Sequence, residues 1–419
     1  MKKPRSTRYA GWFAAVAGVF AIALLADCVS NDSSPTPSDD GGVLSFDGAP
    51  STCATVGSCD ATVVDSALPG DDAATPDGAS PSDDAPASDT DAADAGPLDT
   101  GIADTGDVDT GVTPECPIAP GQTTDAGALA LARGVTIYSV ASDGTDVFWV
   151  NRDPSGGSIA TIPVGGGAMT LLATNRPTPA VLTLDGTRVV WAEYYSIEAI
   201  AKTGAAAPTF IATADMSFGI AVGGGVVAWI EANLGAVFAA PTSGLPDGSA
   251  PIVIASQTVA GSIGDFLAGD ANNFYWIGNN HTLVLQASKN GIPDGGSSSP
   301  TQVGTGNYMF DLQVGPGFVV WTDVGLGEIV RAPIGGGAQT VLASGRSSPA
   351  RLAIDATNVY WTETSGAATA IVSAPLTGVP DGGSPTVLAV DPSSVTAIAA
   401  DGTHVYWADL CNMVFQIAK

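Results

Sequence analysis

The sequence predicts an all-β fold, a seven-bladed β-propeller of four-stranded antiparallel blades. Seven segments share a turn, a run of β-branched or aromatic residues and a tryptophan, and consecutive tryptophans lie 38 to 47 residues apart. Each copy holds four stretches of strand composition, and none of them has helical periodicity. Four-stranded units of about 40 to 45 residues, repeated more than four times, are typical of propeller blades. The tryptophans are Trp149, Trp191, Trp229, Trp276, Trp321, Trp361 and Trp407.

The four predicted strands follow the same order in every copy. An apolar segment such as 181–186 comes first, and a D-G-T or D-A-T turn leads from it into the tryptophan strand. A third strand, such as 158–163, is joined by a Gly-rich connection to a fourth, such as 170–174. In three copies this connection contains Pro-Asp-Gly, in which Pro presets φ and Gly accepts a positive φ. Variation in length is therefore expected in one exposed loop of each blade.

The final copy ends after its third strand. Its predicted strands lie in 394–402, 403–409 and 412–418, and no fourth strand follows. Just before the first copy, residues 128–133 (ALALAR) have the composition of a fourth strand. Because an open blade would leave an unpaired edge, we expect 128–133 to complete the last blade as its outermost strand and so to join the two ends of the chain.

Residues 1–28 have the composition of a secretory signal. Four basic residues lie in the first eight positions, and residues 10–26 are uncharged and mostly apolar. The end of this run is similar to the lipobox of bacterial lipoproteins: Leu25, Ala26 and Cys28 match it, and Asp27 stands where Gly, Ala or Ser is usual. The resemblance implies export, cleavage and lipidation of Cys28. Soluble secretion and an uncleaved N-terminal anchor are the alternatives.

Residues 29–115 differ sharply in composition from the rest of the chain. They contain eighteen Asp, one Glu and no Lys or Arg among Ala, Pro, Ser, Thr and Gly. Such a stretch cannot bury enough apolar surface to offset its ordering entropy, so we predict a disordered acidic tether. Residues 116–419, the predicted propeller, carry ten basic and 22 acidic side chains, a net charge of −12. This charge argues against nucleic acid as a partner, because phosphate binding needs basic patches.

Five cysteines remain to be assigned. With Cys28 assigned to the lipid, an even number is left in a chain that leaves the reducing cytosol. Cys116 and Cys411 lie at the two ends of the repeat region, and we predict that a disulfide between them reinforces the closure of the last blade. Cys53 and Cys59 are candidates for a second disulfide that closes a small loop.

The tryptophan strands carry a family resemblance. VYWTE (359–363), VVWTD (319–323) and VYWAD (405–409) resemble the YWTD repeats of propellers of the low-density-lipoprotein-receptor type. Over about residues 125–419 the pattern is similar to YWTD-like and TolB-like repeat families of bacterial secreted proteins and lipoproteins. The resemblance implies a propeller outside the cytosol. The number of blades departs from it, since YWTD propellers have six blades and seven tryptophan strands imply seven.

Residues suited to catalysis are scarce. Trp side chains at a fixed position in each copy are expected to pack between blades, and the acid two residues later is expected to bond the backbone at the strand end. Of the two histidines, His404 occupies a turn position. No nucleophile elbow, phosphate loop or zinc-binding helix is present in the sequence, so we predict no catalytic residue, metal site or cofactor. The acids are Glu193, Glu231, Asp323, Glu363 and Asp409.

The least repetitive segments enter the first strand and leave the second strand of each blade, on one face of the predicted ring. Exposed aromatic and Arg side chains are favoured at recognition surfaces. We therefore predict a non-catalytic module that binds a protein or glycan at the cell surface, monomeric and held at the membrane by an N-terminal lipid. The alternative is a secreted hydrolase or lyase of the lactonase type, with its site in the central channel. The candidate binding residues are Arg176, Tyr194, Tyr195, Asn279, Asn280, His281, Tyr308 and Arg346.

Overall fold

The structure is a computed structural model. It describes residues 116, 118–153, 155–215, 217–231, 233–246, 249–256, 263–291, 300–380 and 383–419. All of these residues belong to one compact unit, Ile102–Lys419. The predicted signal, the predicted tether and the cysteines Cys28, Cys53 and Cys59 lie outside the described residues.

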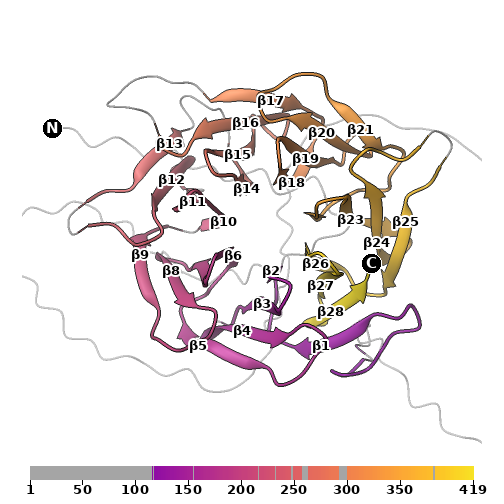
Figure 1. The fold of residues 1–419 in the computed structure, drawn as a ribbon, viewed down its shortest axis with the longest axis horizontal. Helices are drawn as coiled ribbons and strands as arrows, with labels where there is room; N and C mark the ends of the chain where they lie inside the picture. Colours follow the sequence, from indigo (N-terminus) through magenta and orange to yellow (C-terminus); the bar gives the residue numbers. More distant parts are fainter. Residues whose placement is uncertain are drawn as a thin grey trace, which may run out of the picture. The chain divides into compact units, whose positions relative to one another are not determined.

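Seven four-stranded sheets are arranged as blades around a central axis (Figure 1). Neighbouring strands within each sheet are antiparallel. The described part of the chain contains strands and no helix. The predicted all-β, seven-bladed propeller of four-stranded blades is therefore confirmed. We number the blades from one to seven in the order of their tryptophans.

In each blade the first strand lies nearest the axis and the fourth lies at the perimeter (Figure 1). The second strand, which carries the tryptophan, is buried along almost its whole length, as its β-branched and aromatic residues require. Blades one to four comprise β2 (Val140–Ser142), β3 (Asp146–Asn151), β4 (Gly157–Pro163) and β5 (Thr170–Arg176); β6 (Val181–Asp185), β7 (Arg188–Ala192), β8 (Ser196–Ala201) and β9 (Thr209–Thr213); β10 (Ser217–Gly223), β11 (Val226–Glu231), β12 (Ala236–Pro241) and β13 (Ile252–Ser256); and β14 (Ile263–Gly269), β15 (Asn273–Gly278), β16 (Leu283–Ser288) and β17 (Thr301–Thr305).

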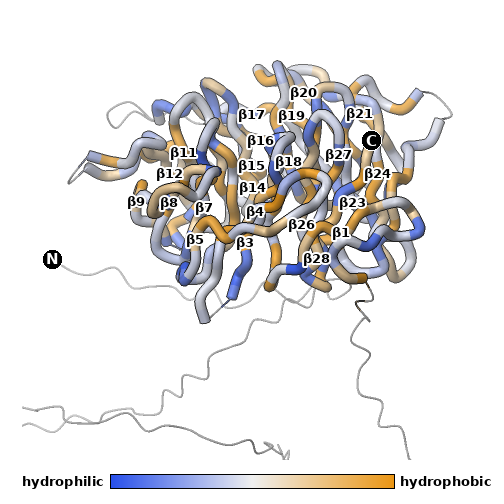
Figure 2. Tube along the Cα trace, turned by 60° about the horizontal axis from the view of Figure 1, so that its bottom comes forward, coloured by the Kyte–Doolittle hydropathy of each residue, from blue (hydrophilic) through white to orange (hydrophobic). Residues whose placement is uncertain are grey.

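The fourth strands are exposed on one side because they form the outer wall of the ring. Hydrophobic stretches follow the strands, and hydrophilic stretches gather at their ends (Figure 2). Blades five to seven comprise β18 (Met309–Gly315), β19 (Phe318–Asp323), β20 (Glu328–Pro333) and β21 (Thr340–Ala343); β22 (Leu352–Ile354), β23 (Asn358–Ser365), β24 (Ala368–Pro375) and β25 (Thr386–Asp391); and β26 (Val395–Ala400), β27 (His404–Asp409), β28 (Met413–Ala418) and β1 (Leu129–Arg133).

Blade seven draws on both ends of the described chain. Its strand order is β1-β28-β27-β26, and β1 pairs antiparallel with β28, with Leu129 opposite Gln416 and Arg133 opposite Met413. The predicted closure by residues 128–133 is therefore confirmed. A disulfide joins Cys116 to Cys411 beside this seam, as the sequence predicted.

All seven repeat tryptophans are at most 1 % exposed. They pack between neighbouring blades: Trp149 of blade one shares a cluster with Ala397 and Tyr406 of blade seven, and Trp229 of blade three shares one with Ile211 of blade two. The large indole therefore fills the space between two sheets, which agrees with the predicted structural role.

The acid two positions after the tryptophan has a side-chain partner in three blades that the prediction did not include. Glu193, Glu231 and Glu363 accept a hydrogen bond from Nε1 of the preceding tryptophan, at 2.7, 3.1 and 2.9 Å. Glu231 also accepts the backbone N–H of Asp215, as predicted, and Asn151 at the same position in blade one accepts Nε1 of Trp149 at 3.0 Å. The prediction is confirmed for Asp323 and Asp409, which accept backbone N–H groups.

The turns between first and second strands are fixed by aspartates. In Asp270, Asp355 and Asp401 one carboxylate oxygen accepts the backbone N–H groups two and three residues later. The other oxygen accepts the hydroxyl of the tyrosine before the tryptophan, for example Tyr275 or Tyr360. This double use of the carboxylate accounts for the aspartate in the turns of blades four, six and seven, where a tyrosine precedes the tryptophan.

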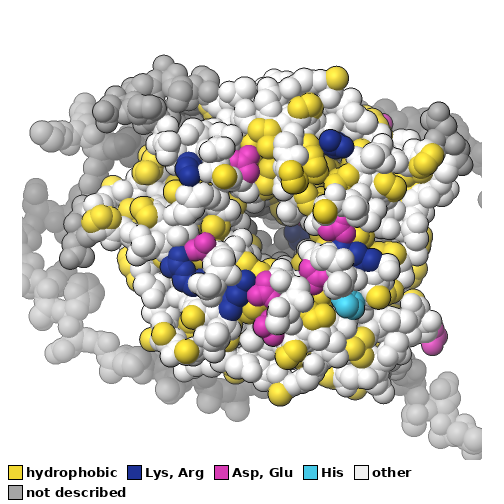
Figure 3. Space-filling view, viewed as in Figure 1, with side chains coloured by type: hydrophobic (Ala, Val, Ile, Leu, Met, Phe, Trp, Pro, Cys, Tyr) yellow, Lys and Arg dark blue, Asp and Glu magenta, His cyan; other side chains and the backbone are white. Residues whose placement is uncertain are grey.

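We call the side of the ring that carries these turns and the loops between third and fourth strands the turn face. Lys and Arg side chains lie beside Asp and Glu side chains around the central opening there (Figure 3). Lys202 forms an ion pair with Asp143 at 2.9 Å. Further ion pairs join Arg188 to Asp185 and Lys419 to Asp355.

Candidate functional site

The predicted binding face lies opposite the turn face. It consists of the loops between second and third strands and the connections that enter each first strand, and we call it the loop face. Among described loop residues, Met169 is the single large apolar side chain exposed on the turn face. The corresponding set on the loop face is Val135, Tyr138, Tyr194, Tyr195, Leu234, Tyr308, Leu326 and Leu410.

One group of predicted site residues lies where blade one meets blade two. Tyr194 and Tyr195 contact each other edge to face, with ring centroids 4.5 Å apart, and Tyr195 is 67 % exposed. Arg176, at the end of β5, reaches into the next blade: its Nε lies 2.5 Å from Oε1 of Glu193, and its Nη2 lies 2.6 Å from Oε1 of Glu198. Tyr194 and Tyr195 therefore come directly after Glu193, whose carboxylate is held in place by Arg176.

The second group lies between blades four and five. Nδ1 of His281 is 2.9 Å from the carbonyl oxygen of Met309, and its ring centroid is 5.4 Å from that of Tyr308. Asn280, His281 and Tyr308 all have φ between 57° and 64°, in the left-handed region that is uncommon for side chains of this size. Tyr308 is exposed there, whereas the half-buried ring of His281 turns to the backbone of Met309.

Arg346 repeats the arrangement of Arg176. Its guanidinium binds both carboxylate oxygens of Glu363, with Nε 2.9 Å from Oε2 and Nη2 2.5 Å from Oε1. Each arginine lies fifteen residues before a tryptophan that is followed two residues later by Glu, so this pairing was present in the sequence as a signal. Both guanidinium groups are engaged in ion pairs between successive blades.

Three exposed leucines on the loop face were missed by sequence reasoning. Leu234, Leu326 and Leu410 are 60, 55 and 50 % exposed and lie in loops between second and third strands. Their distance from the tryptophan is five, five and three residues. This recurrence was the signal that the sequence offered. An apolar residue three to five positions after the tryptophan does not by itself show whether its side chain points into the core or to solvent.

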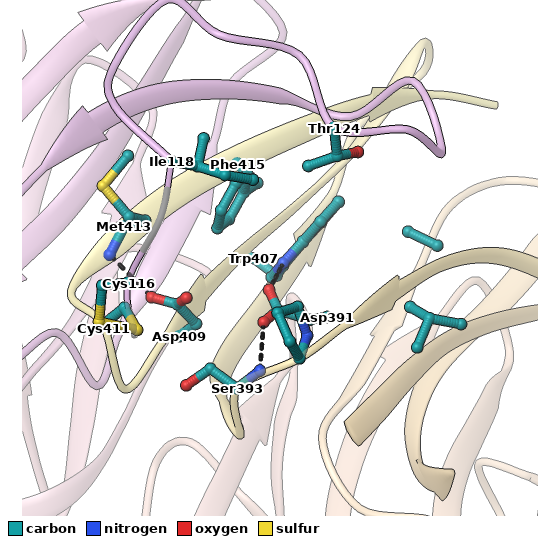
Figure 4. Close-up of a pocket in the computed structure, with 13 residues that line it drawn as sticks. Cys116, Ile118, Thr124, Asp391, Ser393, Trp407, Asp409, Cys411, Met413 and Phe415 are labelled. Atoms are coloured by element: carbon teal, nitrogen blue, oxygen red, sulfur yellow. Dashed lines mark hydrogen bonds between the residues drawn. A yellow bond between two sulfur atoms is a disulfide. The ribbon is translucent and has the colours of Figure 1, made fainter. Parts of the chain in front are cut away.

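A pocket lies at the seam between blades six and seven (Figure 4). We call it the seam pocket; its cavity volume is about 40 Å³. Beside it lies a larger space of about 590 Å³, the outer groove, which shares Ile118, Thr124 and Val390 with the seam pocket. The seam pocket is lined by Cys116, Ile118, Thr124, Ala389, Val390, Asp391, Pro392, Ser393, Trp407, Asp409, Cys411, Met413 and Phe415.

Two carboxylates stand out in this mostly apolar pocket (Figure 4). Asp391, at the end of β25, accepts Nε1 of Trp407 at 2.7 Å, so a residue of blade six takes the role that Glu plays within other blades. Burial raises the pKa of Asp391. Burial, together with the charge of Asp391, raises the pKa of Asp409 to about 7. Sequence reasoning identified Asp409 as a strand-end acid but missed Asp391, which lies outside the repeated motif.

The first strands of blades four to six bring a third set of side chains together near the axis. The guanidinium of Arg351 lies 5.6 Å and 5.2 Å from the ring centroids of Phe266 and Phe310. Asp311, fully buried, accepts the backbone N–H groups of Leu312 and Leu352 and so bridges two first strands. Burial raises the pKa of Asp311 to about 6. These contacts give Asp311 a structural role, because they join the first strands of blades five and six.

Within the described ranges, no three His, Cys, Asp or Glu side chains gather in a way that would hold a metal ion. No helix there is long and apolar enough to cross a membrane. His404 lies beside Thr403 in a turn, 2.8 Å from its hydroxyl, as its sequence position indicated.

Comparison with known proteins places the chain by fold. No protein-family model matches the sequence, and no curated protein does. Among solved structures, an inactive variant of virginiamycin B lyase from Staphylococcus aureus with quinupristin is similar: the TM-score is 0.54 at 15 % identity, over 70 % of this chain and 98 % of that one. This likeness shows the propeller fold alone.

Two further solved structures are more distant. A nidogen/laminin complex matches with a TM-score of 0.41 at 18 % identity, over 56 % of this chain and 89 % of that one. A protein of unknown function from Bacteroides thetaiotaomicron matches with a TM-score of 0.42 at 16 % identity, over 70 % and 71 % of the two chains. The class is defined by the sheets of the chain itself, which form a seven-bladed β-propeller.

Proposed function

We propose that the protein is an exported, lipid-anchored propeller whose loop face binds another protein of the cell envelope without catalysis. The observation that carries this proposal is the set of eight exposed large apolar side chains on the loop face, against one on the described turn face. Apolar groups gathered on one exposed surface are typical of protein interaction sites. Ion pairs occur on both faces, so it is the exposed apolar groups that distinguish the loop face.

The chemistry of these side chains favours a protein over a glycan as partner. Leu234, Leu326 and Leu410 offer apolar surface and no hydrogen-bonding group for sugar hydroxyls. Tyr195 and Tyr308 add the aromatic surface that is enriched in the centre of protein interfaces. The ion pairs of the two arginines with Glu193 and Glu363 hold the neighbouring strand ends in place, which lowers the ordering cost of binding.

The export and anchoring parts of the proposal rest on the sequence. Residues 1–28 are assigned as the signal with lipid attachment at Cys28, and residues 29–115 as the tether that separates the propeller from the membrane. A flexible chain of this length has a root-mean-square span of about 50 Å. The disulfide between Cys116 and Cys411 supports export, because disulfides persist outside the reducing cytosol. The repeats are assigned to the YWTD-like type.

Site-specific crosslinking tests the binding face. A photoreactive residue at Tyr195 or Leu326 of the full-length exported chain should crosslink to one and the same envelope protein, identified by mass spectrometry. The matched controls are Phe210 and Val341 on perimeter strands, which are 55 % and 46 % exposed. Crosslinks of equal yield to the same protein from both pairs would overturn the proposal.

Paired substitutions extend this test to affinity. The variant with Leu234→Ser and Leu326→Ser should bind the crosslinked partner at least tenfold more weakly, because anchor residues of an interface carry much of its binding energy. The variant with Phe210→Ser and Val341→Ser should bind as the parent does. The reverse ranking would overturn the assignment of the loop face.

Lipidation is tested separately. In a bacterial host the parent chain should partition with the membrane, and the peptide that begins at Cys28 should carry the mass of a lipid modification. The Cys28→Ser variant should appear in the soluble fraction. An unmodified Cys28 still preceded by residues 1–27 would instead establish the uncleaved anchor.

A further inference from the structure

The seam pocket brings two carboxylates from different blades onto one small cavity (Figure 4). The carboxylate of Asp391 accepts Nε1 of Trp407 at 2.7 Å and the backbone N–H of Ser393 at 2.8 Å. Asp409 accepts the backbone N–H of Met413 at 2.8 Å. These donors are all neutral, and no ion pair among the described residues includes either aspartate. Above about pH 7 two negative charges therefore share a buried space, and Arg133 is the positive charge that acts on Asp409.

A buried hydroxyl lines the same cavity. Ser393 is 5 % exposed, and its Oγ is buried and makes no hydrogen bond to any described residue. Buried polar atoms of native proteins are nearly always hydrogen-bonded, so each exception needs an explanation. Together, the two aspartates and Ser393 offer negative charge and oxygen acceptors to a small cationic donor.

The side chains that line the seam pocket indicate which chemical group carries that cation. The side chains of Ile118, Trp407 and Phe415 surround the cavity with apolar surface (Figure 4). The outer groove continues this apolar surface along residues 387–390 and includes the exposed carboxylate of Asp125 in its lining. Two adjoining spaces with shared apolar lining and a carboxylate in each match an aliphatic chain with a positive charge at each end.

A primary ammonium fits the inner end better than a divalent metal. It carries one positive charge and three N–H donors, which three acceptors can satisfy. Calcium takes six to eight oxygen ligands, whereas Asp391 and Asp409 already accept Trp407 Nε1 and the backbone N–H groups of Ser393, Met413 and Cys411. In the described ranges no three acidic, His or Cys side chains form a metal-holding group.

We propose that the seam pocket and the outer groove bind an aliphatic diamine, with one ammonium group at Asp391, Asp409 and Ser393 and the other near Asp125. Ser393 and Cys411 lie in segments of the loop face, but the pocket is lined by none of the exposed apolar side chains that carry the proposed protein-binding function, so the two proposals are tested by different ligands. The site lies between β25, β27 and the segment that precedes β1. An occupant therefore also contacts residues from both ends of the described chain, which the closure of blade seven brings together.

Calorimetry on the full-length exported chain tests this site. At pH 8, 1,5-diaminopentane should bind with 1:1 stoichiometry and raise the melting temperature by mass action. 1-Aminopentane should bind more weakly, and 1-pentanol should not bind. No heat and no thermal shift with the diamine would overturn the proposal. A thermal shift with calcium chloride and none with the diamine would also overturn it, in favour of a metal site.

Matched variants locate the binding. Asp409→Asn should weaken diamine binding at least tenfold, whereas Asp323→Asn, at the same repeat position in blade five, should leave it unchanged. Asp125→Asn should weaken binding of the diamine and not of 1-aminopentane. Near-ultraviolet circular dichroism checks that each variant is folded, and Ser393→Ala gives a second substitution inside the pocket. Equal affinity of the Asp409 and Ser393 variants and the parent would place the diamine elsewhere and overturn the site.

The pH dependence separates this site from general attraction to an acidic protein. Asp391 on β25 and Arg133 on β1 are the charged groups that act on Asp409, and the nearby disulfide does not titrate. Affinity should fall about tenfold per pH unit below pH 7 as Asp409 takes up a proton. An affinity that stays constant from pH 8 to pH 5.5 would overturn the role of Asp409.

Discussion

At the scale of single residues, Asp409 couples the stability of the propeller to pH. Burial, and then the charge of Asp391, raises the pKa of Asp409 to about 7, whereas an aspartate in an unfolded chain has a pKa of about 3.9. Between these values the folded protein holds a proton that the unfolded chain has lost. The contribution of Asp409 to the free energy of unfolding is therefore complete below about pH 4. This contribution falls as the pH rises to about 7 and is lost above about pH 7.

The substitution Asp409→Asn tests this coupling. Asn keeps an oxygen that accepts the N–H of Met413 and carries no charge, so the variant should match the parent near pH 4 to 5. At pH 8 it should be more stable by about 3 to 4 kcal/mol, from a pKa difference of about three units. Urea unfolding at both pH values measures the difference. A variant that is less stable than the parent at pH 8 would contradict the account.

The bonds between tryptophan and glutamate support a second residue-scale prediction. Glu231 accepts Nε1 of Trp229 at 3.1 Å, and both side chains are buried. Glu231→Ala leaves the indole N–H without its partner and should cost about 1 to 3 kcal/mol of unfolding free energy. Glu231→Gln keeps an acceptor and should cost much less. Urea unfolding followed by tryptophan fluorescence compares the two; equal losses would count against the hydrogen bond.

The sequence located many single residues but not their contacts. The seven tryptophans and Asp323 behave as predicted, because a repeated position has a repeated environment. Asp391 and Ser393 were not found, since they lie in a connection that other copies do not share. The side-chain direction of Glu193 also could not be predicted, because the side chain at this repeat position accepts the indole N–H in some blades and backbone N–H groups in others.

At the scale of elements, the pairing of β1 with β28 is what closes the ring. Arg133, at the end of β1, also donates to the carbonyl oxygens of Cys411 and Ile118, at 3.2 and 3.1 Å. The disulfide between Cys116 and Cys411 therefore adds a covalent link to a junction that hydrogen bonds already hold. The closure should survive reduction with lower stability.

Removing this disulfide gives a third prediction. The link spans 295 residues, so in the chain-entropy model its loss costs on the order of 5 kcal/mol, and measured losses are often smaller. The variant with Cys116→Ser and Cys411→Ser should fold and melt at a lower temperature than the parent. The variant with Cys53→Ser and Cys59→Ser is the control and should melt as the parent does. A propeller whose melting temperature is unchanged by loss of Cys116 and Cys411 would contradict the prediction.

Strand positions could be predicted from the sequence, and strand register could not. The strands in 158–163 and 328–333, as well as the closing strand, lie where composition and turns indicated. In four of the seven blades the pair of first and second strands contains a register shift, for example between Met309 and Leu312. Such a shift changes which side of the sheet a residue faces, so Phe310 could not be assigned to the axis from the sequence.

At the scale of the whole molecule, the two faces of the ring differ in how they meet solvent. The turn face pairs its charges within and between blades, as Lys202 does with Asp143 (Figure 3). The loop face exposes Tyr195, Leu326 and other apolar groups. The choice of face followed from propeller topology, and the tyrosines were identified in advance. The leucines, which extend the apolar surface around the ring, required the structure.

Covalent footprinting of the propeller in intact cells tests the binding face most directly. Hydroxyl-radical labelling of Tyr195, Tyr308 and Leu326 should be several-fold lower in cells than in the purified full-length chain. Labelling of Phe210 and Val341 on the perimeter should be equal in the two samples. Equal labelling of the loop-face residues in cells and in solution, or protection confined to the perimeter, would contradict the claim that the loop face binds a protein of the envelope.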